Sequence, residues 1–178
     1  MMRFSVSHSP TSGKGSFEEY FAEKWIEPTH LVSRVEALKQ EGKKIATLNG
    51  SFDLLHAGHL HIIYEASLQG DVLIVALNTD SSIQKYKNPK RPIVSLPYRA
   101  RMMAALGFVS FVTCFDETDP RAILEKIRPH VHVNGAEYGA ECIEAEVVQR
   151  HGGKIHIVSL LPGLSTSNLI RKIKDTCD

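Results

Sequence analysis

Two histidines, His56 and His59, carry the strongest chemical signal in the sequence. They flank Gly58 and directly follow a short apolar run at 45–50. At the opening of a helix, residues three apart lie on one face, next to the free N–H groups and the positive end of the helix dipole. A phosphate at this junction would meet backbone amides, the dipole and two imidazole donors. Such donors suit negative charge that grows on a phosphoryl oxygen during attack.

The histidine pair has two other interpretations. The pattern His-x-x-His is half of a zinc site, and His61 lies nearby. The sequence shows no further ligand at a convincing spacing, and the adjoining Gly and Asp residues are typical of a phosphate-binding turn. Two unrelated surface histidines are the remaining alternative. The pattern favours phosphate chemistry and no metal held by protein ligands.

A second polar cluster lies near the end of the chain at 160–175, which includes the segment LPGLSTSNLIRKIKD. Ser165, Thr166 and Ser167 stand where a helix is predicted to begin, so their hydroxyls and free amides could bind the outer phosphates of a triphosphate. Arg171 or Lys172, one turn later, could reach a leaving pyrophosphate. An ordinary Ser/Thr helix cap is the simpler explanation of this motif taken alone.

The elements that must position these groups alternate regularly from Trp25 onward. Apolar runs at 45–50, 71–80, 108–115, 130–135 and 154–160 predict strands, and helical spacing predicts helices at 31–44, 59–70, 97–107, 119–129, 139–153 and 166–175. A basic loop is expected at 84–95. This alternation predicts an α/β fold with a single Rossmann-like, doubly wound parallel sheet flanked by helices. Ligands of such sheets bind at the carboxyl ends of the strands.

Composition limits the classes of protein to which the chain can belong. Its 178 residues include 43% hydrophobic and 23% charged residues, and no apolar run approaches the ~20 residues of a membrane span. A net charge of +1 gives no reason to expect a nucleic acid partner. The three cysteines form no CxxC pair, which predicts a reducing, cytoplasmic location. A flexible polar leader is expected at 1–24 and one domain at 25–178, with no secretory signal.

The segment GSFDLLHAGH resembles the HxGH signature of the cytidylyltransferase-like nucleotidyltransferases. Four segments in order resemble the D-glycero-β-D-manno-heptose 1-phosphate adenylyltransferase group: KKIATLNGSFDLLHAGHLHII, NTDSSIQKYKNPKRPI, YRARMMAALGFV and STSNLIRKIKD. The resemblance implies an enzyme that transfers AMP from ATP to a sugar 1-phosphate and releases pyrophosphate, in the supply of a lipopolysaccharide precursor. It also implies Mg²⁺ carried by the triphosphate, and a homodimer.

The resemblance implies a set of site residues. His56, His59 and Lys44 would be catalytic, although Lys43 is an alternative to Lys44 and both could be solvated strand flanks. The nucleotide would contact Asn49, Gly50, Ser51, Phe52, Gly58, Arg99, Ser165, Thr166, Ser167 and Arg171. The acceptor would contact Asp53, Asn78, Asp80, Lys87, Arg91 and Asn134. Asp80 has an alternative role as a helix cap, Lys87 and Arg91 could belong to a solvated loop, and Arg101 is expected on the surface.

Two departures from the resembled group keep other functions open. Asn134-Gly135-Ala136-Glu137-Tyr138 stands where that group has Lys-Gly-Gly-Asp-Tyr, and Pro97-Tyr98 replaces an acidic residue before the arginine helix. Loss of a lysine removes a charge-assisted hydrogen bond. The alternatives are a CTP-dependent enzyme acting on glycerol 3-phosphate or phosphoethanolamine, and a nucleotide-binding regulatory protein without turnover. An RNA-binding role is disfavoured by the near-neutral charge.

Overall fold

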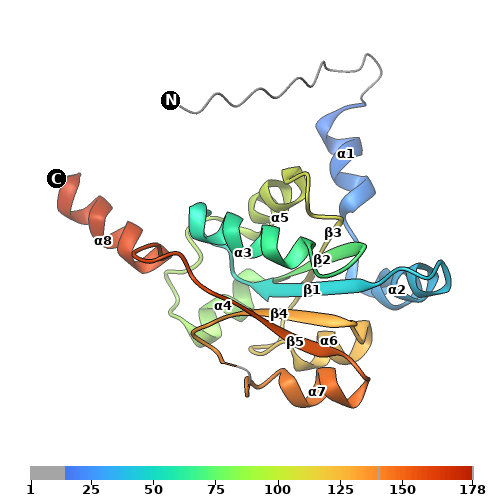
Figure 1. The fold of residues 1–178 in the computed structure, drawn as a ribbon. Helices are drawn as coiled ribbons and strands as arrows, with labels where there is room; N and C mark the ends of the chain where they lie inside the picture. The colour runs from blue at the N-terminus through green and yellow to red at the C-terminus, as the bar shows by residue number, and fades with distance from the viewer. Residues whose placement is uncertain (1–14, 140, 178) are drawn as a thin grey trace, which may run out of the picture.

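The computed structural model describes residues 15–139 and 141–177 and contains one five-stranded parallel sheet (Figure 1). Its strands are β1 (Ile45–Gly50), β2 (Val72–Asn78), β3 (Phe111–Phe115), β4 (Val131–Gly135) and β5 (Lys154–Val158). They are ordered β3-β2-β1-β4-β5, and every neighbouring pair is parallel. The chain runs outward from β1 in one direction and then returns to β4 on its other side. This switch point opens a crevice at the carboxyl ends of β1 and β4, and the predicted fold class is confirmed.

Strand β2 shows why both faces of the sheet must be covered. All seven of its residues are buried, and alternate side chains belong to different cores. Leu73, Val75 and Leu77 pack in one cluster with side chains of the helices at 57–67 and 96–105, whereas Val72, Ile74 and Ala76 pack with those of the helices at 31–40 and 121–127. Successive strand residues point to opposite faces, so the unbroken apolar run is explained by helices above and below it.

The helices follow the predicted alternation, with differences in extent. They are α1 (Phe17–Lys24), α2 (Leu31–Gln40), α3 (Ala57–Ser67), α4 (Asp80–Tyr86), α5 (Leu96–Ala105), α6 (Arg121–Ile127), α7 (Ala145–Arg150) and α8 (Thr166–Thr176), with a 3₁₀ turn at Pro28–His30. Helix α8 projects from the body of the molecule beyond the amino end of α3 (Figure 1). Among the described residues, no helix has the length and apolar character needed to span a bilayer.

Two helices differ from the sequence prediction. Helix α4 was expected only in the alternative that made Asp80 its cap, and that cap is wrong. The Thr79 hydroxyl caps the helix by accepting from the Ser82 N–H at 3.1 Å, while Ile83 is buried beneath it. The basic loop is therefore shorter than predicted and begins at Lys87. Helix α7 covers only 145–150 of the expected 139–153.

The expected leader at 1–24 is wrong for its last eight residues, which form α1. Ser16 and Glu19 form a capping box at the start of this helix. At its end, Lys24 Nζ donates to the carbonyl oxygens of Ala104 and Leu106 at 2.9 and 3.1 Å. Helix α1 is thereby attached to the end of α5. Residues 1–14 of the expected leader lie outside the described residues.

Candidate active site

The two histidines of the HxGH motif lie at the amino end of α3. His56 is the N-cap of this helix, and its Nδ1 accepts from the backbone N–H of His59 at 3.3 Å. The neutral ring therefore carries its proton on Nε2, where it can be donated to a ligand. The two imidazoles are stacked, with ring centroids 3.8 Å apart and planes at 20°. The pair thus occupies one face of the helix opening, as predicted.

Both histidines are neutral near pH 7. Burial lowers the pKa of His59 to about 4, with a further lowering by His56, and burial also lowers the pKa of His56. The imidazoles therefore contribute N–H dipoles and no full charge. A hydrogen bond from the His59 ring to the backbone of Leu54 acts in the opposite direction and raises the pKa of His59, but burial outweighs it.

The Ser/Thr turn meets the HxGH motif in space. Ser165 is the N-cap of α8, and its Oγ accepts from the Asn168 N–H at 3.1 Å. The preceding Leu164 passes so close to α3 that a Cβ on Gly58 would lie 3.3 Å from the Leu164 Cβ and 3.0 Å from the His56 ring. Glycine at position 58 therefore permits the two helix openings to approach each other. Two segments more than a hundred residues apart form one wall of a cleft.

A cleft of about 240 Å³ lies between these motifs and the carboxyl ends of β1 and β4. It is lined by most of the residues that the sequence predicted for nucleotide binding and catalysis: Asn49, Gly50, Ser51, Phe52, His56, Gly58, His59, Ser165 and Thr166, together with Lys87 and Asn134. Ser167 and Arg171 are not among the lining residues. Both are exposed on α8, and an Arg171 nitrogen donates to Asn168 Oδ1 at 2.8 Å.

A second cavity of about 310 Å³ adjoins the first and shares six of its lining residues. The shared residues are Asn49, Gly50, Ser51, Lys87, Asn134 and Tyr138. The second cavity also takes in Asn78 at the end of β2, Tyr86 of α4, and Glu144 before α7. The two cavities therefore lie side by side, one against the helix openings of α3 and α8 and one across the ends of β2, β1 and β4.

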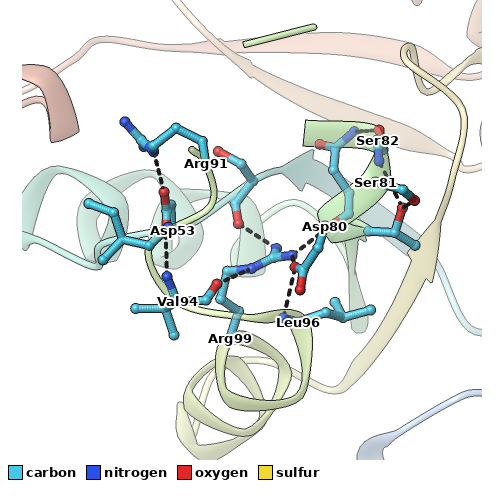
Figure 2. A network of polar contacts seen from close by, with 12 residues as sticks. Asp53, Asp80, Ser81, Ser82, Arg91, Val94, Leu96 and Arg99 are labelled. Carbon is cyan, nitrogen blue, oxygen red and sulfur yellow. Dashed lines mark hydrogen bonds and ion pairs between the residues drawn. The ribbon is translucent and has the colours of Figure 1, made fainter. Parts of the chain in front are cut away.

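Arg99 holds the carboxyl ends of two strands together (Figure 2). Its side chain is fully buried, and it donates to the carbonyl oxygens of Ser51, Asn78 and Val94 at 2.7, 2.8 and 2.9 Å and to Asp80 Oδ1 at 2.7 Å. The predicted nucleotide contact of Arg99 is wrong, because a guanidinium with these partners and no exposed surface does not face the cleft. The Asp80 carboxylate also accepts a hydrogen bond from the Leu96 N–H. It therefore belongs to this structural network and does not contact the phosphorylated substrate.

Asp53 is likewise a structural anchor. Its Oδ1 accepts from the N–H groups of Ile93 and Val94 at 2.7 and 2.8 Å, and its Oδ2 accepts from Arg91 Nε at 2.6 Å (Figure 2). Burial alone would raise the pKa of Asp53, but these donors lower it below its ordinary value. The predicted acceptor contact of Asp53 is wrong, since its side chain is 1% exposed. Asp53 instead attaches the basic loop to the loop after β1. Arg91 is part of this anchor: its side chain is 15% exposed, and it lines neither cavity.

Two lysines predicted to lie near the phosphates are found at opposite ends of the strands: Lys87 at the carboxyl ends and Lys44 at the amino ends. Lys87 Nζ donates to Ser51 Oγ at 2.9 Å and lines both cavities, and burial lowers the pKa of Lys87. Lys44 precedes β1, so the whole strand of six residues separates it from the cleft. At roughly 3.3 Å per residue this distance is about 20 Å. The predicted catalytic role of Lys44 is wrong, because the residue before a parallel strand lies at the edge opposite the ligand site.

Several cleft residues were missed by the sequence analysis. Glu137, Tyr138, Leu160, Leu161 and Leu164 line the first cavity, and Tyr86 and Glu144 line the second. Tyr138 could have been predicted, because it matches the tyrosine of the Lys-Gly-Gly-Asp-Tyr motif to which 134–138 is similar. In the part of the chain that the structure describes, no three His, Cys, Asp or Glu side chains are grouped as metal ligands. Arg101 is on the surface, as predicted, where it pairs with Glu18.

Comparison with known proteins agrees with this geometry. The family model described as "Cytidylyltransferase-like" matches residues 47–171. The chain is 41% identical over 144 residues to the "Bifunctional protein HldE" of Geobacter metallireducens, and 41% identical over 145 residues to the protein of that name from Azotobacter vinelandii. These alignments cover 80% and 81% of this chain but only 29% and 31% of the relatives, so the chain spans about a third of their length.

Solved structures show the same fold. A lipopolysaccharide core biosynthesis protein from Thermoplasma volcanium has 28% sequence identity and a TM-score of 0.54, covering 67% of this chain and 98% of its own. A pantoate-beta-alanine ligase from Francisella tularensis has a TM-score of 0.54 with 14% identity, covering 87% of this chain and 80% of its own, and it supports the fold alone. With the HxGH motif, the switch-point cleft and the family match in agreement, the chain belongs to the cytidylyltransferase-like family of nucleotidyltransferases.

Proposed function

We propose that this protein transfers AMP from ATP to a sugar 1-phosphate of the heptose 1-phosphate type, giving an ADP-sugar and pyrophosphate. One observation carries the proposal: His56 and His59 of one motif and Ser165 and Thr166 of another line a single cleft at the switch point of the sheet. The similarity to the bifunctional HldE proteins, and to a protein named for lipopolysaccharide core biosynthesis, supports the sugar phosphate as acceptor.

The reaction requires positioning more than acid–base chemistry. An oxygen of the acceptor phosphate attacks the α-phosphorus of ATP, and the bond from that phosphorus to the oxygen bridging to the β-phosphate breaks, so pyrophosphate leaves with the electron pair. The acceptor phosphate is already anionic, so no general base is needed. Neutral imidazoles fit this scheme because they are required only as N–H donors to the α-phosphate oxygens. The enzyme gains rate by alignment and charge stabilisation.

The two cavities suggest where each substrate binds. The amino ends of α3 and α8 supply free N–H groups and dipoles to the triphosphate in the first cavity. The acceptor would occupy the second cavity, and Lys87, which lines both, would bind phosphate oxygens at the junction. Mg²⁺ would enter as part of the MgATP substrate, coordinated mainly by phosphates and water.

Pyrophosphate release tests the proposal directly. Purified protein is incubated with ATP or CTP and with heptose 1-phosphate, glycerol 3-phosphate or phosphoethanolamine, and pyrophosphate is measured by a coupled assay. We expect the ATP and heptose 1-phosphate pair to give the highest kcat/KM. The His59→Ala variant should lose about 10²-fold in kcat, as expected for a lost donor to a developing charge. His61→Ala, a change on the same helix outside the cleft lining, is the matched control.

A nucleotide-binding regulatory protein is the second candidate function, and the uncharged Asn134 in the cleft is the observation that favours it. A missing lysine weakens the binding of an acceptor phosphate without removing the triphosphate site. Binding of ATP with no pyrophosphate from any acceptor would support this function and refute the first. A cytoplasmic location and a homodimer remain predictions, and size-exclusion chromatography with light scattering would test the dimer.

A further inference from the structure

Glu144 is a buried carboxylate with few protein partners. The residue is 5% exposed, and its Oε2 accepts one long hydrogen bond, 3.4 Å, from the side-chain amide of Asn134. The Cys142 thiol, a weak donor, also lies within hydrogen-bond reach of this carboxylate. A carboxylate can accept about four hydrogen bonds, and burial of a charged group is costly unless it is paired. In the described residues no ion pair reaches Glu144. The fold therefore leaves acceptor positions open on this side chain.

Local structure does not explain the residue. Glu144 is the N-cap of α7, but its side chain makes no capping hydrogen bond. The arginines of α6 and α7 have other partners: Arg121 binds both carboxylate oxygens of Asp119 at 2.9 Å, and Arg150 pairs with Glu146 and Glu125. A carboxylate retained in a buried position without these roles is a candidate for ligand binding.

The open positions of Glu144 coincide with the second cavity. Glu144 and Asn134 both line it, and their neighbours there include Asn78, Tyr86 and Tyr138. Lys87 lines the same cavity from its anchor on Ser51 at the end of β1, whereas Asn134 lies at the end of β4. These strands are adjacent. The cavity thus offers a cation near one strand end and a carboxylate with an amide near the next, which matches a ligand with a phosphate and several hydroxyl groups.

We propose that Glu144 and Asn134 bind neighbouring hydroxyl groups of the acceptor sugar, each hydroxyl donating to a Glu144 oxygen while the Asn134 amide supplies a donor and an acceptor. This inference rests on the proposed function and deepens it, because it makes the acceptor a polyhydroxylated phosphate. The ribose of the nucleotide carries the same diol chemistry. The acceptor is the favoured source, since both residues lie in the cavity that extends away from the two helix openings.

Steady-state kinetics of Glu144→Gln tests the assignment. With heptose 1-phosphate and ATP, the variant should raise the KM for the sugar phosphate roughly 10- to 100-fold, the range for losing a hydrogen bond to a charged group, and leave the KM for ATP unchanged. Glu146→Gln, on α7 and 84% exposed, is the matched control and should change neither constant. An unchanged KM for the sugar phosphate would overturn the inference, and so would a raised KM for ATP alone, which would assign the pair to the ribose.

Ligand binding measured without turnover separates failure of this inference from failure of the proposed function. In thermal unfolding, heptose 1-phosphate should stabilise the wild-type protein more than inorganic phosphate does, and the difference should vanish in Glu144→Gln. That result would hold even if no pyrophosphate were released. Without ligand, the variant should unfold at the wild-type temperature or above it, because a buried charge has been removed. A clear drop in the unliganded midpoint, or equal stabilisation by the two probes in the wild type, would refute a hydroxyl-binding role.

Discussion

Replacement of Arg99 by methionine should destabilise the fold by removing the group that joins β1, β2 and the loop before α5. The guanidinium binds three carbonyl oxygens and Asp80, and the side chain has no exposed surface. Methionine fills much of the same volume with apolar atoms. The change therefore tests the hydrogen bonds and the charge more than the packing.

The expected loss follows from the groups left behind. Each buried carbonyl without a donor costs about 1–3 kcal/mol, and removal of one partner of a buried ion pair costs about 3–5 kcal/mol. Asp80 is 36% exposed, so water would solvate part of its charge and the ion-pair share is smaller. Two of the three carbonyl hydrogen bonds are only partly buried, so the carbonyls contribute about 3 kcal/mol, the lower end of the range. With about 1 kcal/mol for the partly exposed ion pair, we expect about 4 kcal/mol in total, a large part of the roughly 5–15 kcal/mol of a typical domain. With a urea dependence of about 2 kcal/mol per molar, the midpoint should fall by roughly 2 M.

Urea unfolding followed by fluorescence of the single tryptophan, Trp25, measures this effect, because Trp25 forms a bridge to Val112 at the sheet edge. Arg101→Met is the matched control on the same helix: Arg101 pairs with Glu18 on the surface, and such pairs contribute about 0–1 kcal/mol. Arg99→Lys should fall between them, since it keeps the charge and loses the planar fork. Equal midpoints for the methionine variants at 99 and 101 would refute the assigned role.

Three further outcomes follow from the positions of single side chains. Lys44→Ala should leave kcat for pyrophosphate release within about twofold, because Lys44 lies at the far edge of the sheet; a tenfold loss would contradict this. Ser165→Ala should raise the KM for ATP about fivefold through loss of a cap of about 1 kcal/mol, an effect absent from Ser167→Ala. Burial lowers the pKa of His132 to about 4, below the ~6.5 of an unfolded chain, so the unfolded state binds more protons as the pH falls below 6.5. The free energy of unfolding should drop by about 2 kcal/mol from this group between pH 7 and 5, and urea titrations of His132→Gln should show a pH dependence smaller by that amount.

The features that sequence predicted are those that local periodicity and motif spacing determine. The run of apolar residues in β2 required burial on both faces, and the histidines around Gly58 required a helix opening after a strand. The order of strands and helices then placed the HxGH and Ser/Thr motifs at the same edge of the sheet. Strand direction could also have excluded Lys44, since a residue before a parallel strand lies at the wrong edge.

The roles of the charged residues could not be predicted in this way. Asp53 and Arg99 occur in motifs that suggest ligand contact, and their partners at Ile93, Val94 and Ser51 become neighbours only in the folded chain. Nothing in local spacing distinguishes a carboxylate that binds backbone N–H groups from one that binds a substrate. Glu144 was missed for a related reason. The sequence predicted one helix over 139–153, but α7 begins only at Ala145, and Glu144 directly before it lines the second cavity.

The distribution of charge in the crevice follows from these buried pairs. Asp53 and Asp80 occupy Arg91 and Arg99, so the cation left to line both cavities, among the described residues, is Lys87. The imidazoles there are neutral near pH 7. A triphosphate would then be bound largely by backbone N–H groups, helix dipoles and its own Mg²⁺. Such dipoles are fixed by the fold before the ligand arrives, so they need no rearrangement as charge develops on the α-phosphate. The arginines thus contribute by holding the strand ends and the loop in the geometry that those dipoles require.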